Sequence, residues 1–589
     1  MNVSIIAKKM LRQSSKVFFC VFLFVLFSPY VSWAVYDVAS DRKIKWNAGL
    51  DPVGGIPTNF TQVTCNGLHP DGSVDDTATI NSCISNAPAN TAVYIPNGVY
   101  RIDGNIIMKS NVILRGAKAS RFPWLPTADA NATTLNMNGA YIQFSGGGKS
   151  TSWTPALPNG TSITGGYTKD STILTFSDAS GYAVNDYISI YQNADSSVPI
   201  DDRGYNWLGE DYGVNGVDHH VLQQYSKITG KNGNNIIIDP PINYVSPNPT
   251  GQSVRKQTMT MYNAGVENMR LNGNGSNYRI VQFYFARNCW AKGVETYNVQ
   301  STSGSAHIET NFSFQCEIRD CCVHHESGNN ASGQNYGIGF YWWNSNHKVE
   351  NNIAFDTRHA IIFEGGGSGC AILYNYGLNN YEDDRSALSE SFVSNHGAHP
   401  HMNLWEGNID QQFSADYTQG SSSHNTWFRN WALGYRASPS GYSIEAAMRV
   451  GPYNRYYNLV GNVAGMSTWS SGVAICNGSS CAAGNFPHAF EFGFHTDGSY
   501  LDSASYSTAV LQGNYDYITD GVAVWSDSDH VLANSMYYAA KPAWYAGCTW
   551  PPVDPTNGYV ADTPAKLRYE GSSCVGSMPS APKNLRIIQ

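Results

Sequence analysis

Short apolar segments recur through the second half of the chain in one form: an apolar residue is followed three positions later by asparagine or a second apolar residue. The first residues of these repeat segments are Val266, Val294, Ile318, Val349, Ile372, Trp405, Trp427, Leu459, Leu511 and Val531. Their spacing has a minimum of 20 to 24 residues and is longer elsewhere. This indicates coils of constant circumference with inserted loops of variable length. The pattern predicts a parallel β-solenoid.

The asparagines at the third position have a physical role in such a solenoid. Coils stack about 4.8 Å apart, so inward-turned amides at equivalent positions can form a ladder of hydrogen bonds at the bend between strands. The predicted members of this ladder are Asn352, Asn375, Asn408, Asn430, Asn462, Asn514 and Asn534.

The segment Gly67–Ile102 has a different pattern, with an acidic turn, a short helix and two strands. Asp75 or Asp76 is placed to cap the helix, and Ile80 and Ile84 share one helical face. We expect this helix to close the exposed end of the solenoid.

The strand "YIPNGVY" at Tyr94–Tyr100, with the glycine- and aspartate-rich turn and the helix before it, resembles the opening of the pectate-lyase-like superfamily. The resemblance implies a right-handed parallel β-helix. It implies no single reaction, because similar scaffolds carry lyases, hydrolases, epimerases and phage tailspikes.

The predicted fold class is therefore all-β: a right-handed parallel β-helix with an N-terminal capping helix and a small β insertion. Alternating strands without the coil period predict the insertion, and a Pro-rich, unrepetitive end predicts a wrap over the last coils. The predicted organisation is residues 1–34 as signal peptide, 35–145 as N-terminal cap and first coils, 146–256 as β-rich insertion, 257–540 as coils and 541–589 as C-terminal wrap.

The N-terminus predicts export. Basic residues precede the apolar run Val17–Phe27, and Ser32–Ala34 has the small residues that signal peptidase needs. The alternative is an uncleaved anchor, but the run is shorter than the ~20 apolar residues of a spanning helix. We expect a secreted, periplasmic or cell-surface protein without stable membrane insertion after cleavage.

Export permits disulfides, and the plausible pairs are Cys476/Cys481, Cys65/Cys83 and Cys548/Cys574. Cys316, Cys321 and Cys322 lack the C-x-x-C pairs of structural zinc, so we expect them to be buried thiols. The net charge of −9 offers no basic surface for nucleic acid, but it does not exclude an acidic polymer held by local cations.

Functional residues of a solenoid form columns along one face. Counting seven residues on from the start of four successive repeat segments gives His325, Asp356, Asn379 and Gln412, and the turns at this column carry three ionisable clusters in a chain with only 14% charged residues. These clusters are His324–Glu326, Asp356–His359 and Glu382–Arg385. We expect a binding groove there, although each residue could instead form an ordinary surface ion pair.

A lyase that cleaves a uronate polymer must neutralise a carboxylate, abstract a proton and assist the leaving oxygen. The predicted catalytic residues are His325, Asp356, Arg358, His359 and Arg385: either arginine could hold the carboxylate and either histidine could be the base. Glu382 is assigned to the substrate. Asp383 and Asp384 are candidate ligands for calcium or a source of acid.

Three histidines lie close together in "HGAHPH": His396, His399 and His401. Pro400 excludes the helical zinc geometry. A transition-metal site, contact with sugar, and ordinary hydrogen bonding all remain open. We assign the three histidines and Trp405 to substrate binding.

The sequence thus predicts an exported lyase that cleaves an acidic polysaccharide by β-elimination. The alternatives are a glycoside hydrolase on the same scaffold and a non-catalytic glycan-binding surface protein.

Overall fold

The computed structural model describes residues 35–119, 130–145, 160–193, 220–244, 252–275, 279–300, 306–327, 336–381, 390–434, 436–438, 441–443, 446–469, 471–478, 487–495, 499–523, 525, 531–556 and 558–574. The chain divides into two units: residues 1–37 with 527–533, and residues 38–526 with 534–589. In the first unit, a parallel bridge joins Tyr36 to Leu532. The predicted signal peptide lies outside the described residues, and the coils and their decorations belong to the second unit.

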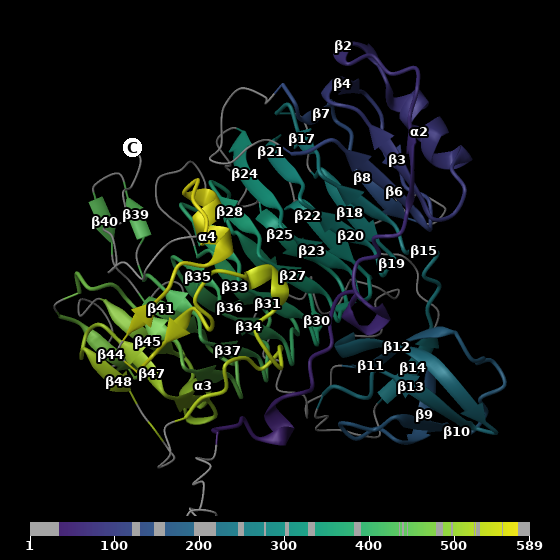
Figure 1. Cartoon of the computed structure of the whole chain (residues 1–589). Coiled ribbons are helices and arrows are strands. Elements are labelled where there is room, and N and C mark those ends of the chain that lie inside the picture. Colours follow the sequence, from purple (N-terminus) through teal and green to yellow (C-terminus); the bar gives the residue numbers. More distant parts are fainter. Residues whose placement is uncertain are drawn as a thin grey trace, which may run out of the picture. The chain divides into compact units, whose positions relative to one another are not determined.

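Three long sheets form the walls of the coils (Figure 1). The first sheet contains, in spatial order, β1 (Thr61–Thr64), β3 (Thr91–Ile95), β6 (Val112–Gly116), β16 (Gly265–Glu267), β20 (Trp290–Lys292), β23 (Glu317–Arg319), β27 (Lys348–Glu350), β31 (Ala371–Leu373), β34 (Leu404–Glu406), β37 (Thr426–Phe428), β42 (Asn458–Val460) and β46 (Val510–Gln512). The second sheet contains, in spatial order, β2 (Asp71–Asp75), β4 (Gly98–Ile102), β7 (Thr133–Met137), β17 (Arg270–Asn272), β21 (Glu295–Gln300), β24 (Cys322–Ser327), β28 (Ile353–Phe355), β32 (Tyr376–Leu378), β35 (Ile409–Asp410), β38 (Trp431–Ala432), β43 (Val463–Ala464), β47 (Asn514–Asp516) and β48 (Gly521–Ala523). The third sheet contains, in spatial order, β44 (Val473–Cys476), β45 (His488–Phe492), β41 (Ala446–Val450), β36 (Phe413–Gln419), β33 (Phe392–Gly397), β29 (Ile361–Phe363), β25 (Tyr336–Phe340), β22 (Ala306–Asn311), β18 (Val281–Tyr284), β8 (Ile142–Ser145) and β5 (Ile106–Ile107).

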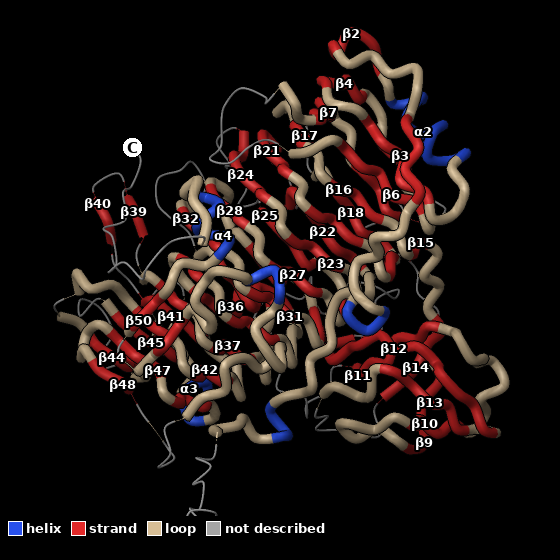
Figure 2. Tube along the Cα trace, in the orientation of Figure 1, coloured by secondary structure: helices blue, strands red, loops and turns tan. Residues whose placement is uncertain are grey.

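Smaller elements decorate these walls. Two short parallel pairs lie at the bends, and two hairpins lie outside the sheets: β15 (Met261–Tyr262) with β19 (Ala286–Arg287), β26 (Asn344–Ser345) with β30 (Gly367–Ser368), β39 (Arg436–Ser438) with β40 (Gly441–Ser443), and β49 (Val553–Asp554) with β50 (Tyr559–Val560). The α-helices of the described residues are α2 (Thr77–Asn86), α3 (Ala504–Ser507) and α4 (Pro564–Tyr569), and all lie outside the coils (Figure 2). No helix in the described ranges is long and apolar enough to cross a membrane.

The strand pairing confirms the predicted parallel β-helix. Neighbouring strands of the three sheets pair in parallel, except that β48 pairs antiparallel with β47. The register joins Val266 to Ala291 and Ala291 to Ile318. The predicted repeat position Val294 is therefore wrong by three residues, because a strand of three residues leaves a second apolar position at the bend that follows it.

The asparagine ladder is confirmed from Asn352 onward. The amide of each member donates to the carbonyl oxygen of the next at 3.0 or 3.1 Å, in the order Asn352, Asn375, Asn408, Asn430, Asn462, Asn514. Each accepting oxygen also accepts a hydrogen bond from the backbone N–H of the preceding member, as when Asn408 N–H donates to Asn430 Oδ1. Asn534 is wrongly predicted, because the first sheet ends at β46 and the chain then leaves the coils.

Aliphatic and aromatic side chains fill the interior of the coils. Trp405 and Trp427 are fully buried there and contact Phe413. Cys65–Cys83 and Cys548–Cys574 are disulfides, as predicted. The predicted buried thiols are confirmed, and the free cysteines of the described residues are Cys289, Cys316, Cys321, Cys322 and Cys370.

A closed barrel interrupts the coils after β8. Its strands are β9 (Thr161–Gly165), β10 (Ile173–Phe176), β11 (Tyr187–Asn193), β12 (His220–Asn232), β13 (Asn235–Asp239) and β14 (Gln252–Lys256). The barrel has its own apolar core, which includes Leu174, Ile190 and Ile236. It contacts the coils where Tyr225 N–H donates to Ser345 Oγ at 3.0 Å.

Chain segments cover the outer faces of two sheets. On the first sheet, Glu406 accepts hydrogen bonds from Met536 and Tyr537 of the C-terminal segment. On the second sheet, Ala565 of α4 packs among Ile353 and Tyr376. The polar outer face of the third sheet is where a site can form.

Candidate functional site

Five neighbouring strands of the third sheet bring ionisable side chains to its outer face. Side chains alternate along a strand, so the residues that follow the core positions Phe340 and Phe363 point outward. The outward residues are Glu309 on β22, Tyr341 after β25, Glu364 after β29, His396 on β33 and Asp416 on β36. We call these five residues the acid–base cluster.

His396 and Asp416 form a hydrogen-bonded pair. His396 Nδ1 lies 2.6 Å from Asp416 Oδ2, so Nδ1 donates and Nε2 is left for a substrate. The imidazole is 17% exposed and the carboxylate 14%. Burial opposes the imidazolium, but the charge and hydrogen bond of Asp416, together with Glu364, raise the pKa of His396 above its ordinary value.

Glu364 is the least compensated acid of the cluster. It is 4% exposed, and its buried Oε2 has no hydrogen-bond partner. Burial raises the pKa of Glu364 to about 7, the charge of Glu309 adds to the rise, and His396 and Arg358 partly offset it. A carboxyl with this pKa can donate a proton near neutral pH.

Arg358 and His359 lie between β28 and β29 and face the cluster. Burial lowers the pKa of His359 to about 3, and the Arg358 charge contributes. The ring of His359 stacks on Tyr336 at 5.1 Å, and its Nδ1 hydrogen-bonds the carbonyl of Glu390. The positive charge of Arg358 lowers the pKa of both Glu364 and His396.

Ion pairs flank the cluster along the sheet. On one side, Arg279 lies 3.2 Å from Glu309. On the other, Arg449 lies 2.7 Å from Glu491 and 3.6 Å from Glu390. Each arginine is paired with at least one carboxylate, so ion pairs flank Glu364 on both sides.

His325 and Asp356 lie at the end of the second sheet, apart from the acid–base cluster. Their column contains residues in the left-handed conformation, with φ of 54° at His325, 55° at Asp356 and 51° at Asn379. Asn, Asp and His tolerate this conformation better than most residues. The backbone of the turn thus accounts for three of the four polar residues of the column, and His325 Nε2 and Asp356 Oδ2 lie 3.5 Å apart within it.

Several predicted residues do not enter the site. Glu382, Asp383, Asp384 and Arg385 lie outside the described residues, and with them the predicted calcium ligands. Trp405 is a correction: its ring lies in the core with no exposed surface, because the first residue of its repeat segment points inward.

His399 and His401 are also buried, at 2% and 1% exposure, in the turn before β34. Their contacts are inside the molecule: His399 Nε2 with Ser423 Oγ at 2.9 Å, and His401 Nδ1 with the carbonyl of His399 at 2.9 Å. The assignment of this pair to substrate binding is therefore corrected, because only His396 of the three faces the outer surface of the third sheet.

Sequence reasoning did not place Asp416 or Glu309 at the site. Each is an isolated acid in an otherwise apolar or neutral strand, as in "AHIETN" and "FSADY".

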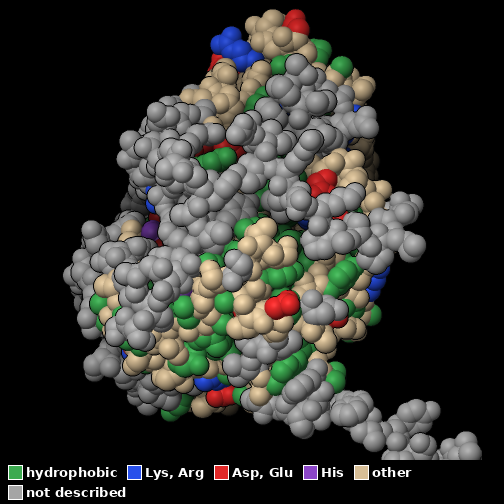
Figure 3. Space-filling view, turned by 90° about the vertical axis from the view of Figure 1, so that its left-hand side faces the viewer, with side chains coloured by type: hydrophobic (Ala, Val, Ile, Leu, Met, Phe, Trp, Pro, Cys, Tyr) green, Lys and Arg blue, Asp and Glu red, His purple; other side chains and the backbone are tan. Residues whose placement is uncertain are grey.

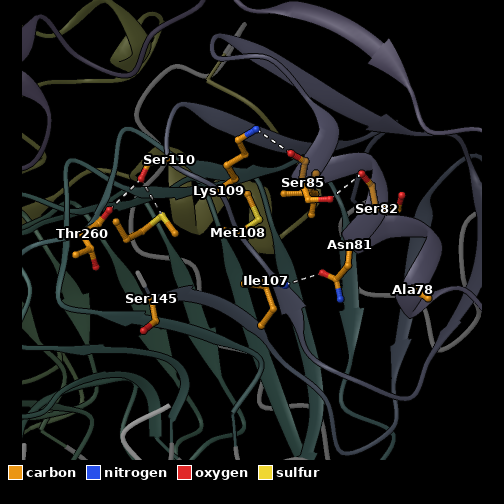
Figure 4. A pocket seen from close by; sticks show the side chains of 12 residues that line it. Ala78, Asn81, Ser82, Ser85, Ile107, Met108, Lys109, Ser110, Ser145 and Thr260 are labelled. Atoms are coloured by element: carbon orange, nitrogen blue, oxygen red, sulfur yellow. Dashed lines mark hydrogen bonds between the residues drawn. The ribbon is translucent and has the colours of Figure 1, made fainter. Parts of the chain in front are cut away.

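A cavity lies apart from the acid–base cluster. A shallow cavity of about 730 Å³ lies between α2 and β5, with Asn81, Ser85 and Lys109 on its wall (Figure 4). These polar groups already bond to the protein, as when Lys109 Nζ donates to the carbonyls of Ser85 and Ala87 at 2.8 and 2.7 Å. On the face in Figure 3, the coloured residues are mainly apolar or uncharged and show no extended patch of Lys and Arg.

Residues 60–177 match the sequence model of the family described as "Rhamnogalacturonase A/epimerase, pectate lyase-like". No curated protein is significantly similar in sequence to the chain. The tailspike protein gp49 from Pseudomonas phage LKA1 is a similar structure, with a TM-score of 0.45 and 14% identity over 73% of this chain and 69% of that chain.

Two further solved structures are similar over comparable shares of this chain. The gp54 tailspike of Acinetobacter baumannii bacteriophage AP22, solved with A. baumannii capsular saccharide, has a TM-score of 0.43 and 11% identity over 76% of this chain and 66% of that chain. The polygalacturonase from Erwinia carotovora ssp. carotovora has a TM-score of 0.33 and 12% identity over 76% of this chain and 97% of that chain. The family match covers Tyr94–Tyr100, so residues 60–177 are similar to the pectate-lyase-like family, and the paired sheets show that the fold is a parallel β-helix.

Proposed function

We propose that the protein is an exported polysaccharide lyase that cleaves an acidic, uronate-containing polymer at the acid–base cluster. The observation that carries the proposal is Glu364, a buried carboxyl with a pKa of about 7 beside the His396–Asp416 pair. The family description at residues 60–177 names a rhamnogalacturonase and an epimerase, which supports a polysaccharide as substrate.

The proposed reaction is a β-elimination in which each group has one task. Arg358 neutralises the uronate carboxylate and so acidifies the C5 proton. His396 Nε2 accepts that proton, while Asp416 holds the ring and stabilises the imidazolium. The electron pair forms the C4–C5 double bond as the C4–O bond breaks, and Glu364 protonates the leaving oxygen.

Calcium is a separate proposal for Asp383 and Asp384. Two adjacent carboxylates suit the oxygen ligation of calcium. Cleavage is therefore to be measured both with calcium and with a chelator.

The test is absorbance near 235 nm while the purified chain is incubated with a panel of uronate polymers. We expect a rise on one polymer that Glu364→Gln and His396→Gln abolish. Glu570→Gln is the matched control, since Glu570 is 43% exposed on the surface beside α4. New reducing ends without absorbance would make the site a hydrolase, and neither signal would leave glycan binding as the better account.

A further inference from the structure

Four ionisable side chains at the end of the second sheet form a continuous series of contacts from a buried glutamate to the surface. His324 Nε2 lies 3.1 Å from Glu295 Oε1, and His324 Nδ1 lies 2.8 Å from His325 Nδ1. His325 Nε2 lies 3.5 Å from Asp356 Oδ2. Exposure rises along the series, because the side chain of His324 is fully buried and that of His325 is 31% exposed.

Aromatic rings hold the buried histidine in one orientation. The ring of His324 stacks between Tyr297 and Phe355, its in-register neighbours on β21 and β28, with centroid distances of 5.8 and 5.0 Å. Phe355 also meets the ring of His325 edge-on, at 5.3 Å. Because stacking fixes the plane of the His324 ring, its two nitrogens stay directed at Glu295 and His325.

The contacts determine which ring nitrogens carry hydrogen. Arg270 Nε lies 3.3 Å from Glu295 Oε1, so Glu295 is a carboxylate, which only accepts. Burial lowers the pKa of His324, so this ring is neutral and holds its one proton on Nε2, toward Glu295. His324 Nδ1 therefore accepts a hydrogen bond, and His325 Nδ1 donates it. A further proton enters the series at His325 Nε2, which faces Asp356.

Other titratable groups lie around His325. His307 on β22 is electrostatically coupled to it, and burial lowers the pKa of His307 to about 3, so that ring is neutral. Tyr569 of α4 is coupled to Asp356, and burial raises the pKa of Tyr569 to about 12, so it is neutral too. Glu326 follows His325 on β24. The carboxylates Asp356 and Glu326 therefore favour a proton on His325 Nε2.

The turn after Asp356 carries the arginine of the proposed reaction. Asp356 has a left-handed backbone, with φ of 55°. Thr357 is fully buried, and its Oγ1 donates to Asn380 Oδ1 at 2.8 Å. Arg358 comes next, and its charge acts against the proton on His396. Asp356 and Thr357 thus anchor the backbone from which the Arg358 side chain extends.

We propose that the His325–Asp356 ion pair is a proton-dependent positioning device, which holds the turn that places Arg358 at the acid–base cluster. The pair is complete while His325 Nε2 is protonated and is lost as pH rises and that proton leaves. The turn then keeps the Thr357 anchor alone, and Arg358 holds the uronate carboxylate less well. The effect on cleavage rests on the proposed lyase function, whereas the effect on the position of Arg358 does not.

The first test needs no polymer. NMR titration of the full chain, labelled at the histidine Cε1 carbons, follows His325 and His396 separately. Asp356→Asn removes the charge but keeps a residue type that tolerates the left-handed backbone. We expect this variant to move the titration of His325 to lower pH. We also expect it to raise the pKa of His396, because Arg358 is no longer held near that ring.

Asp320→Asn is the matched control. Asp320 also has a left-handed backbone, with φ of 57°, and its carboxylate lies 3.1 Å from Arg319 at a different bend of the coil. Neither histidine titration should move in this variant. If the titration of His396 stays in place, or moves to lower pH, in Asp356→Asn, the proposal is wrong.

The second readout is the pH dependence of cleavage. Asp356→Asn and His325→Asn should each lower kcat/KM about tenfold at pH 6, because misplacement of a substrate-positioning group is costly. At pH 9 the loss should be less than about twofold, since the wild-type pair is itself broken there. An equal loss at both pH values would show a merely structural pair and overturn the proposal.

Crystal structures of the wild-type chain at pH 5 and pH 9 keep the test decisive if the variants do not fold. We expect the Arg358 guanidinium near His396 at pH 5 and displaced from it at pH 9. The same position at both pH values would overturn the proposal. The titration and the crystal structures do not depend on polymer cleavage, so failure of the positioning device and failure of the lyase assay are separate results.

Discussion

The outer faces of the first and third sheets both bury charged groups, but they compensate them differently. On the first sheet, Lys348 is 2% exposed and lies 2.7 Å from Asp51 and 3.3 Å from Glu317. On the third sheet, Glu364 is 4% exposed and has no ion pair within the described ranges. Similar burial therefore produces a closed ion-pair network in one place and, in the other, an acid whose burial is only partly offset by its neighbours.

The difference separates structural charges from functional ones. Buried ions that neutralise one another hold segments together, in this case the N-terminal segment with Asp51 and the C-terminal segment with Tyr538, which hydrogen-bonds Glu350. An acid without such partners lowers stability, and its shifted pKa is the property that proton transfer needs. Glu350 also has a pKa of about 7, so the shift alone does not mark a catalytic group.

The largest expected effect is on activity. Glu364→Gln should lower kcat by about 10²- to 10⁴-fold, because the leaving oxygen loses its proton donor. Glu350→Gln should leave kcat within about twofold, although the two carboxyls have similar pKa values. The measurement is the rate of absorbance change at saturating polymer. Equal losses of kcat in both variants would contradict the division into structural charges on the first sheet and functional charges on the third.

Breaking the network of the first sheet should cost the most stability. Lys348→Met leaves Glu317 and Asp51 without their buried cation, and we expect a loss of about 3–5 kcal/mol in the free energy of unfolding. The measurement is urea unfolding followed by tryptophan fluorescence. Lys292→Met on β20 of the same sheet is the control, with a change below about 1 kcal/mol.

Ionisation of Glu364 should destabilise the fold as pH rises. Its pKa is about 7 in the folded chain against an ordinary value of 4.5, so its contribution is complete below pH 4.5 and is lost as pH rises through 7. At pH 8, Glu364→Gln should be more stable than wild type by up to about 3 kcal/mol. Urea unfolding at pH 4 and pH 8 checks this, and an equal difference at both would refute it.

The smallest effect expected is a shift in a pH profile. Asp416 raises the pKa of His396, so Asp416→Asn should lower the pKa of His396. Because the base must be neutral to accept a proton, the acidic limb of kcat/KM should then move to lower pH. Asp562→Asn, at a carboxylate 42% exposed near α4, should leave the limb in place. A shift to higher pH would place the base elsewhere.

The sequence predicts some residues of the site correctly and assigns others wrongly, for a physical reason in each case. The sequence predicts Arg358 and His396, and both lie at the acid–base cluster. His325 and Asp356 stand out as a polar column, but a left-handed backbone also selects for Asn, Asp and His, and a one-dimensional pattern does not separate the two causes. Trp405 is misassigned to binding because aromatic side chains suit both sugar and core.

The sequence by itself determined the coil repeat, the asparagine ladder from Asn352 to Asn514, the N-terminal helix and two disulfides. These features follow from local spacing, which repeats in every coil. Only the tertiary structure decided that Glu364, His396 and Asp416 share one face, and that His399 and His401 are buried. Loops of unequal length separate these residues along the chain, and strand pairing across coils, rather than sequence distance, sets which of them meet.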